Sequence, residues 1–78
     1  MKITMRDGRV FQGTPLQIVQ SMQRIAFGVD DFTIPQYIDW VVANARRFEE
    51  VELVITGATP DEKAAALVSE MLRVGLAV

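Results

Sequence analysis

The chain has 78 residues, half of them apolar, and a formal net charge of −2. It contains no Cys and no His, which excludes disulfides, thiolate nucleophiles and thiolate metal ligands. No apolar run approaches the roughly 20 residues that a membrane helix needs, and the charged N-terminal segment lacks the apolar core of a signal peptide. We therefore expect a single cytoplasmic domain over residues 1–78.

Residues 2–12 predict a β-hairpin, because two apolar-alternating segments flank an Asp-Gly dipeptide. Asp-Gly supplies the positive φ angles that tight hairpin turns require. Two registers are open: a two-residue turn pairs Met5 with Val10, whereas a three-residue loop pairs Ile3 with Phe11. We favour the second register, because it buries the larger apolar side chain of Phe11.

Three helices are expected from one recurring start signal, the sequences "TPLQ", "TIPQ" and "TPDE". In each, a Thr stands three residues before Gln or Glu, at Thr14, Thr33 and Thr59. This spacing allows the reciprocal hydrogen bonds of a capping box. Gly28 and Gly75 are the expected helix stops.

Between the second and third helices, the sequence "VELVIT" at residues 51–56 alternates apolar and mostly polar side chains. Such alternation is typical of a strand with one covered face. The expected fold is therefore α+β, with the element order β-β-α-α-β-α. In it, a three-stranded sheet, made of the N-terminal hairpin and this later strand, carries three helices on one face.

The second expected helix has more apolar surface than one stripe can use. On a helical wheel, one apolar stripe collects Ile34, Ile38, Val41, Ala45 and Phe48. Tyr37 lies at the margin of that stripe, and Trp40 lies about 100° from its centre, on the side of Asn44 and Arg47.

Two interpretations of Trp40 remain open. Either the hairpin or the loop before the second helix folds over it and completes the core, or it belongs to a contact patch. In the second case the patch consists of Tyr37, Trp40, Asn44 and Arg47, since aromatic residues and Arg are over-represented at interface hot spots.

We expect no catalytic, cofactor-binding or metal site, and therefore no enzyme. Asp30, Asp31 and Asp39 could attract a hard cation, but they lack the alternating ligands and Gly turn of a calcium loop. The two serines have no His to activate them, and the glycines have the spacing of turns rather than of a phosphate-binding loop.

Association with nucleic acid is the alternative function. Arg6 and Arg9 flank the hairpin turn, Arg46 and Arg47 close the second helix, and their convergence would make a small basic area. Against this stand a sequence pI of about 4.9 and the absence of any recognition motif.

The segments "DGRVFQGTPLQIV" and "YIDWVVANARRF" resemble those of short, stand-alone bacterial proteins of unknown function. The resemblance implies a small cytoplasmic bacterial domain and no activity. Taken with the residue pattern, it leads us to expect a non-enzymatic domain that contacts an unidentified protein or a second copy of itself, as in a homodimer.

Overall fold

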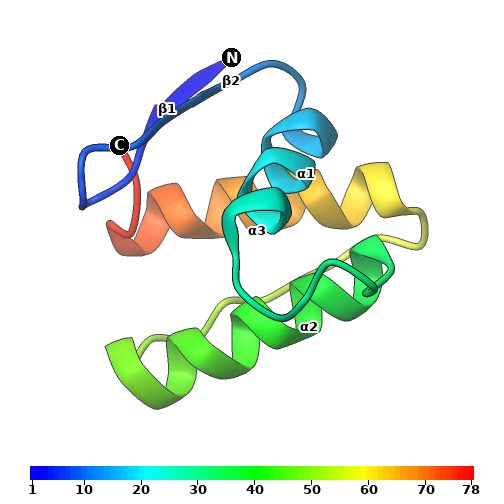
Figure 1. Ribbon diagram of the computed structural model, residues 1–78. Coiled ribbons are helices and arrows are strands. Elements are labelled where there is room, and N and C mark those ends of the chain that lie inside the picture. The colour runs from blue at the N-terminus through cyan, green and yellow to red at the C-terminus, as the bar shows by residue number, and fades with distance from the viewer.

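A computed structural model describes all residues from 1 to 78. The chain forms a hairpin of two short strands and then four helical elements (Figure 1). In chain order these are β1 (Lys2–Thr4), β2 (Val10–Gln12), α1 (Pro15–Ile25), α2 (Ile34–Asn44), the π-helix η1 (Ala45–Glu49) and α3 (Pro60–Val74).

All three helix starts are confirmed. Thr14, Thr33 and Thr59 each occupy an N-cap, and each forms the complete capping box with the Gln or Glu three residues later. The stop at Gly75 is also confirmed, since this residue caps α3 in a left-handed conformation with φ 81°. The stop at Gly28 is wrong by two residues, because α1 ends at Ile25 and its C-cap is Ala26, in an extended conformation.

The hairpin adopts the favoured register, with Ile3 opposite Phe11. Ile3 is buried and Phe11 is partly buried against the core. The other edge of β1 is covered by the end of the chain, because Thr4 exchanges two backbone hydrogen bonds with Val78, of 2.8 and 2.9 Å. The C-terminal residues therefore take the place beside β1 that a third strand could have filled.

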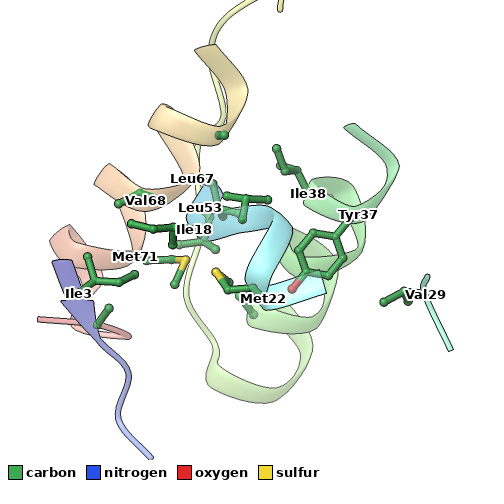
Figure 2. Packing of buried hydrophobic residues seen from close by; sticks show 14 residues of the cluster. Ile3, Ile18, Met22, Val29, Tyr37, Ile38, Leu53, Leu67, Val68 and Met71 are labelled. Atoms are coloured by element: carbon green, nitrogen blue, oxygen red, sulfur yellow. The ribbon is translucent and has the colours of Figure 1, made fainter. Parts of the chain in front are cut away.

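The helices form two levels below the hairpin (Figure 1). The helices α1 and α3 cross in the middle of the molecule, and α2 lies on their far side from the hairpin. The core between these levels is entirely apolar apart from the hydroxyl of Tyr37, and no charged side chain is buried (Figure 2). None of the helices has the length and apolar character needed to cross a bilayer.

The prediction of a third strand at residues 51–56 is wrong. The sheet has two strands in the order β1-β2, and residues 52–57 form no backbone-to-backbone hydrogen bond. The predicted order β-β-α-α-β-α and the three helices on one face of a sheet are therefore not found. The expected alternation is nevertheless present, since Leu53 is buried whereas Glu52 and Val54 are exposed.

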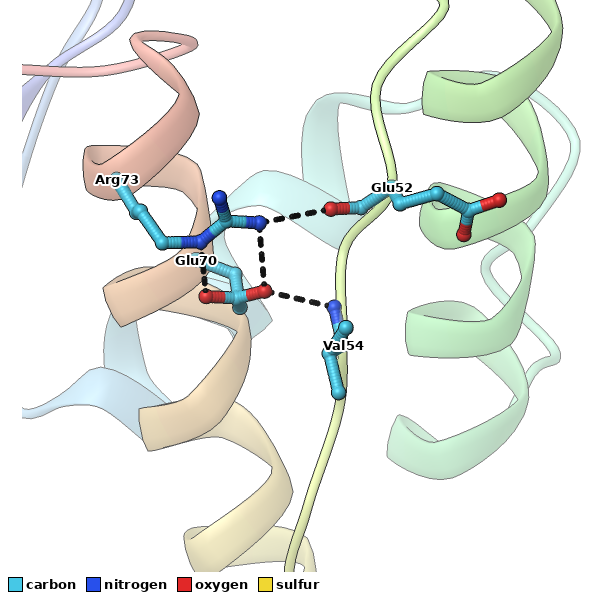
Figure 3. A network of polar contacts seen from close by, with 4 residues as sticks. All are labelled: Glu52, Val54, Glu70 and Arg73. Carbon is cyan, nitrogen blue, oxygen red and sulfur yellow. Dashed lines mark hydrogen bonds and ion pairs between the residues drawn. The ribbon is translucent and has the colours of Figure 1, made fainter.

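The extended segment is held by side chains of α3 in place of a neighbouring strand (Figure 3). The Val54 N–H donates to the Glu70 carboxylate at 2.8 Å, and the Arg73 guanidinium donates to the Glu52 carbonyl at 3.0 Å. Arg73 also donates to Glu70 at 2.7 Å. These bonds satisfy polar backbone groups that a strand partner would otherwise pair.

Candidate functional site

The C-terminal end of α2 continues into the wider turn of η1, whose C-cap, Glu50, has a left-handed conformation with φ 56°. A π-turn takes more residues than an α-turn, and such turns are frequent at functional sites. A wider turn changes the angle between successive residues, so the α-helical wheel that placed Phe48 in the core stripe does not apply to this segment. Phe48 is 68% exposed.

Trp40 lies between the two interpretations that the sequence left open. Its side chain is 38% exposed, and its ring stacks on Tyr37 with the ring centroids 5.8 Å apart and the planes at 24°. It therefore contributes to the edge of the core while keeping part of its indole ring open to an adjacent groove.

The groove next to Trp40 has a volume of about 440 Å³, which is within the size range of ligand pockets. The helical side of the groove is lined by Tyr37, Trp40, Val41, Asn44, Ala45, Phe48 and Glu49. The other side chains that line it, from the hairpin turn, α1 and the C-terminal segment, are Met5, Arg6, Asp7, Met22 and Leu76. A second hollow of about 160 Å³ extends it toward the end of α1.

Tyr37 lines both hollows and is 3% exposed. Its hydroxyl forms no hydrogen bond within the chain, although no fully enclosed side-chain oxygen or nitrogen is left without a partner. The hydroxyl therefore keeps some solvent contact beside the two hollows that Tyr37 lines, and in Figure 2 it points toward Met22, which also lines both. Burial raises the pKa of Tyr37 to about 12, so the hydroxyl stays protonated and available as a donor.

The four residues of the predicted patch do not all contribute in the same way. Asn44 is half-buried in the groove, and its amide nitrogen donates to the Trp40 carbonyl at 2.9 Å. Because that bond uses the nitrogen, the amide oxygen of Asn44 remains free to accept. Arg47 lies outside the groove, with its guanidinium carbon 5.3 Å from the centre of the Phe48 ring.

The hairpin turn is fastened to the helical side of the groove by one side chain. Arg6 donates to the Gly75 carbonyl at 2.9 Å and to the Glu49 carboxylate at 3.1 Å. A hairpin that folds over Trp40 is one of the two interpretations open from the sequence, but the residues that make this side of the groove could not be named, because it arises only when segments that are distant in the chain pack together.

The basic area that would favour nucleic acid is largely neutralised by ion pairs. Arg6 pairs with Glu49, Arg9 pairs with Asp7 at 3.4 Å, and Arg46 pairs with Glu52 at 2.8 Å. Of the four arginines considered, only Arg47 has no acidic partner.

The acidic side chains form no group of three or more that could hold a metal ion. Where carboxylates have clearly shifted pKa values, the cause is a structural hydrogen bond. Hydrogen bonds from the Arg73 side chain and then from the Val54 N–H lower the pKa of Glu70 to about 2. Backbone N–H groups of Thr59 and Ala58 lower the pKa of Glu62 at the start of α3.

Comparisons of the chain with protein-family models, with curated proteins and with solved structures find no match. The resemblance to short bacterial proteins therefore stays a prediction that rests on the two sequence segments between Asp7 and Phe48.

Proposed function

We propose that the chain is a non-enzymatic protein-contact domain, whose groove beside Trp40 receives an apolar side chain of another polypeptide. The observation that carries the proposal is the combination of apolar walls with an unpartnered Tyr37 hydroxyl in one groove. An apolar pocket with a few convergent polar groups is the usual form of a binding site.

The polar groups in the groove suit a polypeptide. Tyr37 offers a hydrogen-bond donor and the amide oxygen of Asn44 offers an acceptor, so together they can serve the C=O and N–H groups that accompany every side chain of a bound segment. The partly exposed Trp40 is of a residue type that is enriched among interface hot spots, and so is Arg47, which packs on the groove-lining Phe48.

Photo-cross-linking in cells that express the chain tests this proposal. Ala43 is exposed and lies outside the groove, but it adjoins Asn44 and is one helical turn from Trp40, which both line it, so p-benzoylphenylalanine at this position can reach a polypeptide bound there. The same probe at Ala65, an exposed Ala of α3, is the matched control. We expect an adduct of discrete mass from position 43 only, and its loss when Trp40→Ala is added. No adduct from position 43, or equal adducts from both positions, would contradict the proposal.

A further inference from the structure

We infer that the occupant of the groove is a second copy of this chain, and that each copy inserts Phe48 into the groove of the other. This inference rests on the proposed function and adds the identity of the partner. The groove and the projecting side chain lie on one face, since Phe48 both borders the groove and is 68% exposed. A face that carries both complementary features can pair with itself about a two-fold axis.

The helix end that carries Phe48 also supplies hydrogen-bond acceptors. The last carbonyls of a helix have no partner within it, and at the end of η1 only the Ala45 carbonyl is used by the capping N–H of Glu50. Carbonyls adjoining Phe48 would therefore enter the groove together with its ring. There the protonated hydroxyl of Tyr37, which lacks a partner in its own chain, can donate to one of them.

Charge contributes to the fit as well. Arg47, which stacks on Phe48, has no acidic partner in its own chain. The groove is bordered by the carboxylates of Asp7 and Glu49 and by Arg6. Glu49 pairs with Arg6 and Asp7 pairs with Arg9, but both carboxylates stay about half exposed. When Phe48 enters the groove of the other copy, its neighbour Arg47 comes to these accessible carboxylates. Complementary charges of this kind orient an encounter and disfavour wrong partners.

The area available is sufficient for such a pair. A standard interface takes about 800 Å² from each partner, which is roughly a sixth of the 4911 Å² surface of the chain. One face of a molecule with extents of 26 × 25 × 25 Å can provide this. Because each groove is filled by the other copy, association stops at two subunits.

Sedimentation equilibrium on the purified chain tests the inference through a mixing experiment. Phe48→Ala removes the inserted ring and Trp40→Ala damages the groove, so a homodimer of either variant loses both contacts. An equimolar mixture retains one, because the Trp40→Ala subunit still offers Phe48 to the groove of the Phe48→Ala subunit, which keeps Trp40 and lacks only the wall that its own Phe48 supplied. Phe27→Ala, at a 99% exposed position that borders neither hollow, is the matched control.

We expect a dimer for the wild type and for Phe27→Ala. Loss of one hot-spot contact weakens association about 30-fold and loss of both about 1,000-fold, so the mixture should dimerise at concentrations where each variant alone is monomeric. If Trp40→Ala does not fold, Asn44→Arg, which obstructs the groove, takes its place. A monomeric wild type, a Phe48→Ala variant that dimerises normally, or a mixture that gains nothing would each overturn the inference. A discrete cross-link to a different protein would also overturn this inference, but it would agree with the proposed function.

Discussion

The extended segment between η1 and α3 has no strand partner, so its attachment depends on the side chains of its inner face. Leu53 is 3% exposed, whereas the adjacent Val54 is 61% exposed. Leu53→Ala removes three carbons, worth about 0.8 kcal/mol each by transfer, and it leaves a cavity that adds to the cost. The free energy of unfolding should therefore fall by about 3 kcal/mol.

Thermal unfolding followed by circular dichroism measures this effect. In a domain of this size, each kcal/mol shifts the Tm by about 4–8 °C, so Leu53→Ala should lower the Tm by about 12–24 °C. Val54→Ala is the matched control and should change the free energy of unfolding by no more than about 0.5 kcal/mol. If Val54→Ala costs as much as Leu53→Ala, the segment does not turn its Leu53 face to the core and the reasoning is refuted.

Three further predictions concern local interactions. Thr59→Ala removes the side-chain half of a capping box and should cost about 1 kcal/mol, measured by chemical denaturation; an unchanged midpoint would contradict it. The pKa of Glu70 is about 2 in the fold, against an ordinary value of 4.5, so its stabilising effect is complete above pH 4.5 and is lost as the pH falls from there toward 2. Glu70→Gln should therefore weaken the dependence of the Tm on pH in that window. A variant whose Tm falls with pH as steeply as that of the wild type would contradict this. Calcium, magnesium or zinc should leave the Tm unchanged, because no ligand set binds the folded form selectively; a saturable rise would implicate Asp30, Asp31 or Asp39.

The parts of the fold that could be predicted are those that depend on neighbouring residues. A capping box needs only a Thr and a Gln or Glu three residues apart, so each helix start was found from four letters. The hairpin register followed from one comparison of buried area, because pairing Ile3 with Phe11 brings the largest side chain of the hairpin onto the core side. In both cases the sequence contains every group that takes part.

The prediction of a third strand was wrong because the alternation of apolar and polar residues shows only that one face of the segment is covered. It does not identify the group that satisfies the backbone. Here the Glu70 carboxylate accepts a hydrogen bond from the Val54 N–H, and the Arg73 guanidinium donates one to the Glu52 carbonyl. The end of the chain occupies the free edge of β1. Both solutions depend on contacts between distant segments, which no local pattern records.

The candidate site was predicted only in part, and the cause is the same: contacts between distant segments are not visible in a local pattern. Trp40 departs from the apolar stripe of its helix, and this departure drew attention to the helical side of the groove. Phe48 was placed in the core instead, because the wheel assumed an α-helix through a segment that forms the wider turn of η1. The hairpin was one of two segments expected to fold over Trp40, but Met5 and Asp7 could not be named as the residues that do so, since their contribution exists only after the turn packs beside α2.

The accessibility of Trp40 over a dilution series tests the central claim most directly. This residue is the only Trp of the chain, so acrylamide quenching of its fluorescence reports on this site alone. In a single copy Trp40 is 38% exposed, and a self-associated copy should cover it. We predict that quenching decreases as the concentration of the wild type rises, and that Phe48→Ala keeps the high quenching of the dilute protein throughout. Quenching that stays the same from the most dilute to the most concentrated wild-type sample would contradict the account.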